Sequence, residues 1–282
     1  MNIFEVLKSG IEILNKNNVE DSEFDARCLL EEAFGFNKSD YFLNKFSMAD
    51  EDKTEAFVSL INRRASGEPL QYIIGKWPFM SGEFYVGKGV LIPRSDTEVL
   101  VEVAANFIRN HKHVKNVYDL CAGSGCIGIS IAMMFPDVNV YCVELSDIAF
   151  SYLEKNIELN DVKNVTAVKG DILQGYEKLS DKQIDVLVSN PPYIETDEIS
   201  TLSREVKEEP FMALDGGEDG YLFYNCINQK WIPFLERGSF AAFECGETQA
   251  QMLKEIFSEY SEKTEILKDL NDIERVVSIV RN

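Results

Sequence analysis

Apolar side chains recur at steps of three and four residues over about the first 66 positions of the chain. This spacing is typical of helices with one apolar face. Its three runs are Ile3, Val6, Leu7, Ile11 and Leu14, then Phe24, Cys28, Leu29 and Phe34, and finally Phe57, Leu60 and Ile61. Ser47 and Asp50 carry side-chain oxygens that can cap the third helix. We expect residues 1–66 to form a small helical domain.

The pattern changes between Gly67 and Ser95, where glycines and prolines separate short stretches of alternating apolar and polar residues. Such alternation indicates strands, and the glycines indicate turns. We expect residues 67–95 to form a connector with a β-hairpin. Its turns are predicted near Ser81-Gly82 and near Gly87 to Gly89.

From residue 96 onward, strands and helices are predicted to alternate. Strands are expected at 116–120, 138–144, 164–170, 184–189, 238–246 and 273–280, and helices at 96–110, from Cys126, at 147–160 and at 248–259. Alternating strands and helices are typical of a parallel sheet covered by helices. Residues 96–282 are therefore expected to form an α/β domain.

The composition is typical of a folded soluble protein, with 45% hydrophobic and 27% charged residues among 282. No apolar run reaches about 18 residues, so no membrane-spanning helix is expected. The N-terminal stretch also lacks the continuous apolar segment of a secretory signal. We expect a cytoplasmic protein with no membrane partner.

The chain is strongly acidic, with 28 Lys and Arg against 48 Asp and Glu and a formal net charge of −20. Because such a surface repels nucleic acid at long range, we expect no direct nucleic-acid partner. The two histidines, His111 and His113, lie in a polar stretch, and the six cysteines form no CxxC pair. No metal site is therefore expected.

The segment DLCAGSGCIG, residues 119–128, joins a predicted strand to a predicted helix. Gly123, Gly125 and Gly128 match G-x-G-x-x-G in the context that makes this pattern meaningful. Small residues let a cofactor approach the backbone, and a helix N-terminus offers free amides. Glu144 ends the next strand, where its carboxylate can accept hydrogen bonds from ribose hydroxyls. The pattern predicts a nucleoside cofactor at the carboxyl ends of the strands.

Two cofactors fit this pattern: a dinucleotide for hydride transfer and S-adenosylmethionine for methyl transfer. Asp171 and Ile172 directly follow the third strand of the sheet and suit adenine recognition in either case. The carboxylate would contact the exocyclic amine while Ile172 packs on the ring. Asp171 is equally compatible with a plain turn.

The segment SNPPYI, residues 189–194, begins at the last residue of IDVLVS (184–189), which is predicted to be a buried strand. Residues at the carboxyl edge of a parallel sheet project into the ligand crevice. The Asn190 side-chain oxygen and the Pro191 carbonyl can accept the two hydrogens of a planar –NH2 group, and Tyr193 can stack on its π system. Because such a nitrogen is a poor nucleophile, holding it in line is the main task. This favours methyl transfer over hydride transfer, although Asn-Pro and Pro-Pro also end strands without any further role.

These residues resemble the class I S-adenosylmethionine-dependent N-methyltransferases. Five stretches resemble more specifically the HemK-type release factor glutamine methyltransferases: EPLQYIIG (68–75), FMSGEFYV (79–86), LIPRSDTEVLVE (91–102), SNPPYI (189–194) and ALDGGEDG (213–220). The resemblance implies a Rossmann-like, mostly parallel seven-stranded sheet with helices on both faces and a small N-terminal helical domain. It also implies N5-methylation of the glutamine in the Gly-Gly-Gln loop of class 1 peptide chain release factors.

The resemblance also assigns roles to residues. S-adenosylmethionine would contact Thr97, Cys121, Ala122, Gly123, Ser124, Gly125, Glu144, Asp171, Ile172 and Asn190. The catalytic residues would be Asn190, Pro191 and Tyr193, and the substrate glutamine would contact Asn190, Pro191, Pro192 and Tyr193. Residues 1–66 would dock the release factor, and a monomer is expected. Where Cys121 stands, the family more often has glycine.

Three other functions have to be weighed against this one, and the sequence argues against each. The main alternative is an N-methyltransferase that acts on an exocyclic amino group of a nucleic-acid base, since NPPY-type sequences occur there too. It would need a basic track, which this acidic chain does not offer. A non-catalytic cofactor-binding module is the second alternative. A dehydrogenase is the third, although the sequence offers no catalytic His or Tyr–Lys arrangement near the cleft.

Overall fold

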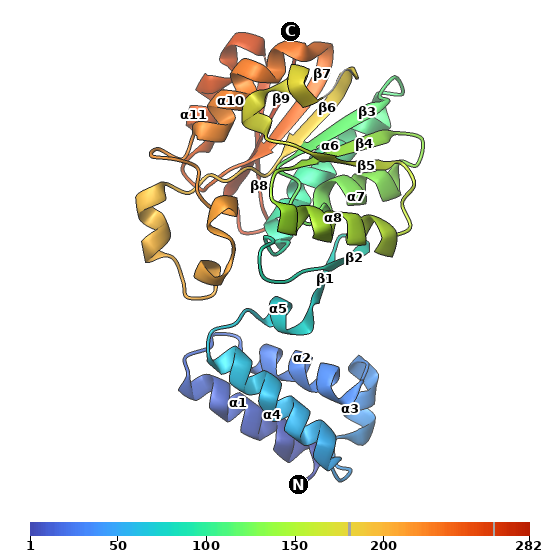
Figure 1. Ribbon diagram of the computed structural model, residues 1–282, viewed down its shortest axis with the longest axis vertical. Helices are drawn as coiled ribbons and strands as arrows, with labels where there is room; N and C mark the ends of the chain where they lie inside the picture. The colour runs from blue at the N-terminus through green and yellow to red at the C-terminus, as the bar shows by residue number, and fades with distance from the viewer. Residues whose placement is uncertain (180–181, 262) are drawn as a thin grey trace. The chain divides into compact units, whose positions relative to one another are not determined.

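The computed structural model describes residues 1–179, 182–261 and 263–282, and the chain divides into two compact units (Figure 1). The helical unit contains Met1–Lys76 together with Ser203–Glu208. The sheet unit contains Trp77–Leu202 and Glu209–Asn282. Each unit is described separately below. None of the helices in the described ranges is both long and apolar enough to cross a membrane.

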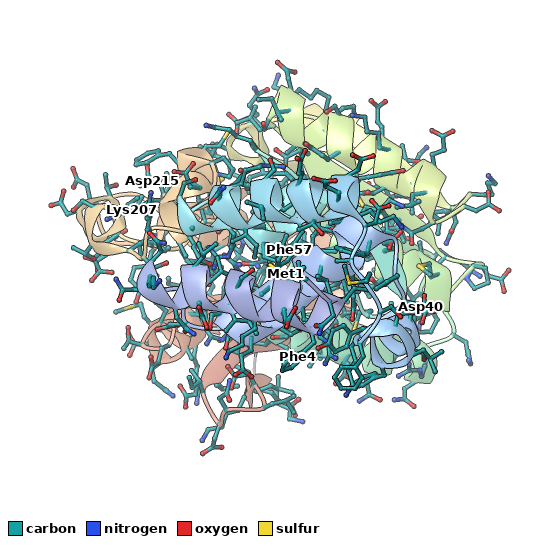
Figure 2. The ribbon with its side chains drawn as sticks, turned by 90° about the horizontal axis from the view of Figure 1, so that it is seen from below. Met1, Phe4, Asp40, Phe57, Lys207 and Asp215 are labelled. Atoms are coloured by element: carbon teal, nitrogen blue, oxygen red, sulfur yellow. The ribbon has the colours of Figure 1, made fainter. Side chains whose placement is uncertain are left out.

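The helical unit is built from α1 (Ile3–Lys16), α2 (Ser22–Phe34), α3 (Lys38–Asn44), α4 (Glu51–Ala65) and α5 (Leu70–Ile74). The three helices expected from apolar spacing are confirmed, whereas α3 and α5 were not predicted. Asp50 caps α4 by accepting a hydrogen bond from Lys53 N at 3.1 Å, while Ser47 does not cap it. Buried side chains of α1, α2 and α4, including Leu14, Leu29 and Phe57, form the core between these helices (Figure 2).

A buried ion pair links α2 to α4 in the helical unit. Arg64 Nε donates to Asp25 Oδ2 at 2.6 Å, and both side chains are almost fully buried. Arg64 also pairs with Glu205, which lies in the segment Ser203–Glu208. This segment therefore belongs to the helical unit even though it is far away in sequence.

The sheet unit contains a seven-stranded sheet in the order β5-β4-β3-β6-β7-β9-β8. Its strands are β3 (Asn116–Leu120), β4 (Asn139–Glu144), β5 (Val165–Lys169), β6 (Ile184–Ser189), β7 (Leu235–Glu244), β8 (Lys263–Lys268) and β9 (Glu274–Val280). The first five run parallel to one another, and within the described sheet only β9 runs against the others. The mostly parallel, seven-stranded sheet is thus confirmed, although β8 was not predicted.

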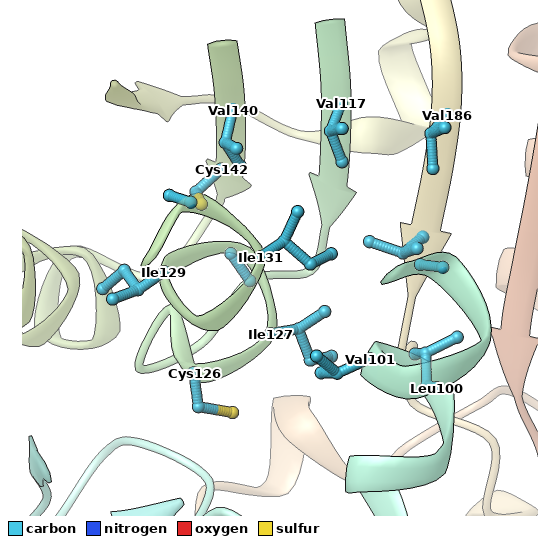
Figure 3. Packing of buried hydrophobic residues seen from close by; sticks show 14 of the residues in the cluster. Leu100, Val101, Val117, Cys126, Ile127, Ile129, Ile131, Val140, Cys142 and Val186 are labelled. Carbon is cyan, nitrogen blue, oxygen red and sulfur yellow. The ribbon is translucent and has the colours of Figure 1, made fainter. Parts of the chain in front are cut away.

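Helices cover both faces of this sheet, because side chains along each strand alternate between two cores. One core takes Val117, Val140, Val186 and Phe240 and packs against α6 (Glu98–Asn110), α7 (Cys126–Met134) and α8 (Asp147–Leu159). Figure 3 shows Ile127 and Ile131 of α7 beside strands β4, β3 and β6 in this core.

The other core lies on the opposite face of the sheet. It contains Tyr118, Leu187 and Phe243, which lie on the same strands as Val117, Val186 and Phe240 but at an odd number of positions from them. This core packs against α10 (Leu222–Lys230) and α11 (Ala250–Ile256). Trp231, just after α10, is fully buried in it. The short helix α9 (Tyr176–Leu179) follows β5, and neither α9 nor α10 was predicted.

The hairpin expected in the connector is confirmed as β1 (Lys76–Phe79) and β2 (Gly82–Tyr85). Asn156 of α8 and Asn160, the C-cap of this helix, bind the backbone of β2. Asn156 accepts from Tyr85 N at 2.6 Å and donates to Tyr85 O at 3.1 Å, and Asn160 makes the same pair of bonds with Glu83. These four hydrogen bonds hold the backbone of β2 against the C-terminal half of α8.

Candidate active site

A cleft lies at the carboxyl ends of β3, β4, β5 and β6. Each strand contributes the residues that directly follow it or end it: Cys121 to Ser124, Glu144 to Ser146, Gly170 to Ile172, and Asn190 with Pro192. Ligands of open parallel sheets bind at this edge. The cleft has the mixed apolar and polar lining of a cofactor site.

The glycine loop, Cys121–Gly125, turns from β3 into α7. Gly123 has φ +57°, and a Cβ there would meet no other atom within 4 Å, so its open side leaves room for a ligand. At Gly128 there is no room for a side chain, because a Cβ would lie 2.4 Å from Cys142 Sγ on β4. Cys121 adopts φ +59°, which is why glycine suits this position as well.

Glu144 ends β4 and holds the glycine loop. Its Oε2 accepts a hydrogen bond from Gly123 N at 2.8 Å, and its Oε1 accepts from Ser146 N at 2.6 Å. Burial raises the pKa of this carboxyl, and the backbone amides of Ser146 and Gly123 oppose that rise. A carboxylate has further lone pairs, so these two bonds leave capacity for ribose hydroxyls.

Asp171 and Ile172 follow β5 and line the same cleft. Asp171 Oδ1 accepts from Leu173 N at 2.9 Å, so the carboxylate caps a short 3-10 helix, as the turn interpretation required. Ile172 is buried, and its carbonyl accepts from the indole nitrogen of Trp231 at 2.9 Å. This bond fixes an apolar wall of the cleft.

Asn190 leaves the fully buried strand β6 and lines the cleft together with the glycine loop. Its Nδ2 donates to Thr97 Oγ1 at 3.3 Å, and the Thr97 side chain is buried. Among the described residues, none donates a hydrogen bond to Asn190 Oδ1. The carboxamide is thus anchored through its donor side, and its acceptor oxygen is unengaged.

The segment ALDGGEDG holds the loop that follows Asn190. Ile194 N donates to Leu214 O at 3.0 Å, and Gly216 N donates to Ile194 O at 2.8 Å. Gln249 Nε2 donates to the Tyr193 carbonyl at 3.0 Å. A Cβ on Gly216 would lie 2.7 Å from Tyr193 Cα, so only glycine fits against this backbone. The loop is therefore fixed by backbone contacts on both sides.

The structure brings most of the expected site residues into one cleft, although their roles are still predictions. Those that line it are Thr97, Cys121, Ala122, Gly123, Ser124, Glu144, Asp171, Ile172, Asn190 and Pro192. Gly125, Pro191 and Tyr193 are not among its lining residues; Gly125 is the N-cap of α7, while Pro191 and Tyr193 flank Pro192.

Sequence reasoning missed a second group of residues around the cleft. Ser146, Met212 and Phe223 line it, and Glu244 and Gln249 lie behind the loop after β6. They come from separate segments and share no local motif. One local pattern among them is visible in the sequence, the G-x-x-Q spacing of Gly246 and Gln249. Gly246 N donates to Gln249 Oε1 at 2.9 Å, which closes a turn.

Two family models match the chain: the PrmC N-terminal domain over residues 5–75 and the methyltransferase small domain over residues 95–216. The chain is 36% identical to the release factor glutamine methyltransferase of Clostridium botulinum, over 97% of both chains. It is 37% identical to that of Clostridium acetobutylicum, over 100% of this chain and 99% of the relative.

Among solved structures, the chain is similar to the hMettl16 catalytic domain in complex with MAT2A 3'UTR hairpin 1. The TM-score is 0.56 at 14% identity, and the likeness covers 84% of each chain. At this identity it concerns the fold alone, and it confirms the fold class expected from the sequence.

Proposed function

The chain belongs to the family of release factor glutamine methyltransferases, and from this premise we propose its cofactor, its substrate and the roles of its residues. It is a methyltransferase. The cofactor is S-adenosylmethionine, and the substrate is the side-chain amide nitrogen of the glutamine in the Gly-Gly-Gln loop of class 1 peptide chain release factors.

The position of Asn190 carries this proposal. Its side chain lies in the same cleft as the glycine loop, is anchored on Thr97, and keeps its Oδ1 unengaged by the described residues. An unengaged acceptor beside a cofactor cleft suits a ligand that brings N–H donors. The side chain of glutamine brings such a donor pair on a planar nitrogen.

The residues of the cleft fit the cofactor. Gly123 leaves open space where any other residue would place a side chain, and Glu144 lies beside it with lone pairs to spare. We assign the amino acid part of the cofactor to Thr97 and the glycine loop, its ribose to Glu144, and its adenine to Asp171 and Ile172. S-adenosylmethionine supplies a methyl group bound to a positively charged sulfur.

The protein acts on the amide nitrogen mainly by holding it. Asn190 Oδ1 and the Pro191 carbonyl accept its two hydrogens, Pro192 stiffens the loop, and Tyr193 stacks on the amide plane. The nitrogen lone pair, which is delocalised in the free amide, then points at the methyl carbon. The cofactor would supply its methyl group to this nitrogen and keep the electrons of the carbon–sulfur bond, while Asn190 and Pro191 would hold the nitrogen until one N–H proton leaves to solvent.

The direct test is mass spectrometry of a release factor after incubation with this protein and S-adenosylmethionine. We expect a gain of about 14 Da on the loop glutamine, the mass of one CH2 group. An Asn190→Ala variant should still bind the cofactor and lose about 10²-fold or more in kcat. Methylation of RNA or DNA bases, with none of release factor, would instead support the nucleic-acid alternative, which the relatives do not favour.

We further propose that the helical unit docks the release factor through an exposed apolar patch, formed by Met1, Phe4, Phe42, Leu43, Phe46 and Met48. Backbone hydrogen bonds hold its parts together, since Phe4 N donates to Lys45 O at 2.8 Å and Ile3 N donates to Ser47 O at 3.1 Å. Leu43 is 81% exposed and Phe46 is 74% exposed. Exposed apolar clusters of this kind commonly bind proteins.

A comparison of two substrates tests the patch. The double variant Leu43→Ser/Phe46→Ser should raise KM for full-length release factor at least tenfold, because each side chain loses about 1.5–3 kcal/mol of burial. The kinetics on an isolated Gly-Gly-Gln peptide should not change. Val58→Ser, on the exposed face of α4, is the control. Equal effects on both substrates would refute docking through the patch.

We expect the reaction to occur in the cytoplasm, with the protein as a monomer.

A further inference from the structure

Glu244 lies beside Asn190 and has no role in the proposed chemistry so far. It is the last residue of β7, and the register of β6 with β7 pairs Ser189 with Phe243, so Asn190 and Glu244 follow side by side. Its side chain is only 2% exposed. Tyr224 donates to the Glu244 carbonyl at 2.6 Å, which fixes the backbone at this point.

The Glu244 carboxyl is incompletely partnered. Its Oε2 is fully buried, and no described residue donates a hydrogen bond to it. The side chains of Thr97 and Asn190 lie near the carboxyl and favour its charged form, as does the more distant Arg275. Arg275 itself is shared with Asp269 at 3.2 Å and Asp96 at 3.6 Å. Burying a carboxyl without a full set of hydrogen-bond partners lowers the stability of the fold, so a glutamate at this position calls for a functional explanation.

The chemistry of the Asn190 carboxamide supplies that reason. A carboxamide can turn over and exchange its oxygen for its NH2 group, and the substrate grip works only with the oxygen toward the cleft. Thr97 does not prevent this exchange, because a hydroxyl both donates and accepts. An ionised carboxylate only accepts, so it attracts the NH2 group and repels the oxygen.

We propose that ionised Glu244 is a positioning residue that fixes the orientation of the Asn190 carboxamide, with Nδ2 toward the protein and Oδ1 toward the substrate nitrogen. The proposal rests on the proposed function and extends it to a residue behind the cleft. When Glu244 is protonated it can donate to the Asn190 oxygen, and the preference for one orientation is lost.

The Glu244 carboxyl changes its protonation state near neutral pH, where its effect on kcat can be measured. Burial raises the pKa of Glu244 to about 7, against the opposing influence of Thr97, Arg275 and Asn190. Asp96 adds to the rise, and the other titratable groups that interact with this carboxyl are Tyr193, Cys245, Tyr224 and Cys126. Since the ionised form is the active one, kcat should increase as the pH rises through about 7.

Kinetics of two variants provide the first test. Glu244→Gln keeps the shape but can donate as well as accept, and it should lower kcat about 10²-fold while the Kd for S-adenosylmethionine stays within about twofold. Glu244→Asp keeps an acceptor-only group and should recover part of this loss. A Glu244→Gln protein with wild-type kcat, or a Glu244→Asp protein no better than Glu244→Gln, would overturn the proposal.

A second test does not depend on catalysis. The side-chain 15N and 1H resonances of Asn190, assigned by their loss in Asn190→Ala, should shift with pH in the wild-type protein with a midpoint near 7. The shift should be absent in Glu244→Gln. It should persist in Asp119→Asn, because Asp119 is another buried carboxyl whose pKa burial raises to about 7.

The two tests fail independently. If the wild-type protein does not methylate release factor, the proposed function fails, and the resonances of Asn190 still report on Glu244. If the pH-dependent shift of the Asn190 resonances persists in Glu244→Gln, or if it is lost in Asp119→Asn, the positioning role is refuted even when methylation is observed.

Discussion

Asn156, on helix α8, donates a hydrogen bond from Nδ2 to the main-chain carbonyl of Ser124 in the glycine loop, at 2.9 Å. The same carboxamide binds both backbone groups of Tyr85 in β2. Asn156 is completely buried. One side chain therefore ties the cofactor loop to the hairpin, and its removal affects both.

The Asn156→Ala change should lower the free energy of unfolding by about 2–4 kcal/mol, because it removes the hydrogen bonds that Asn156 makes to the backbone of Tyr85 and Ser124. It should also weaken S-adenosylmethionine binding, since the glycine loop loses a support. Denaturant unfolding and isothermal titration calorimetry measure the two effects. Asn160→Ala is the matched control: Asn160 binds the backbone of Glu83 and the carbonyl of Asn156 but not the glycine loop, so the cofactor Kd should not change. An equal loss of affinity in both variants would contradict this role of Asn156.

The Gly216→Ala change should displace the loop that carries Pro191 to Ile194. The new Cβ would lie 2.7 Å from Tyr193 Cα, and a backbone atom cannot move aside as a flexible side chain can. We expect kcat to fall at least tenfold with the cofactor Kd unchanged.

Gly238→Ala is the control for Gly216→Ala. Gly238 has φ +85° and open space around it, so alanine there should cost about 1 kcal/mol of stability with no change in kcat. Loss of cofactor binding in Gly216→Ala would show that the change spreads beyond the loop.

Tyr193 should contribute through its ring and not through its hydroxyl. Burial raises the pKa of Tyr193 well above its ordinary value, so the hydroxyl stays neutral and supplies no base. Tyr193→Phe should retain most of kcat/KM, whereas Tyr193→Ala should lose roughly 5- to 150-fold, the equivalent of about 1–3 kcal/mol of stacking. Steady-state kinetics on a Gly-Gly-Gln peptide measure both. Equal losses in the two variants would refute stacking as the role of Tyr193.

Asp119 should make the stability of the sheet unit depend on pH. Its carboxyl accepts from Gly128 N at 2.9 Å, and burial raises its pKa from 3.8 to about 7. Between these values the folded form holds its proton while the unfolded form releases it, so the free energy of unfolding falls as the pH rises.

The comparison of Asp119→Asn with wild type isolates this effect. From about pH 4 to about pH 7, the stability of the variant relative to wild type should increase by on the order of 1–4 kcal/mol. Thermal unfolding across this range measures the difference. A constant difference at all pH values would mean that Asp119 is ionised in the folded protein.

The parts of the site that follow strands could be predicted from the sequence. Cys121 to Ser124, Glu144, Asp171 and Asn190 each end or follow a strand that apolar runs reveal, and parallel strands bring their carboxyl ends together. Local pattern and one topological rule are sufficient for these positions.

The supporting residues could not be found in this way. Asn156 and Gln249 act through hydrogen bonds to backbone groups 71 and 56 positions away. Glu244 acts by burial, which only the packed sheet produces. The edge strand β8, KTEILK, alternates weakly between polar and apolar residues, so its pattern does not distinguish it from a loop.

The segment Ser203–Glu208 has a consequence for dissecting the protein. Because it interrupts the sheet unit in sequence and completes the helical unit in space, the polypeptide passes between the units three times. Truncation before Trp77 would not yield a clean catalytic fragment: Arg204 and Glu205 would remain without Ser66 and Arg64, the residues they bind. A protease that nicks the 76–77 bond should leave two pieces that still copurify.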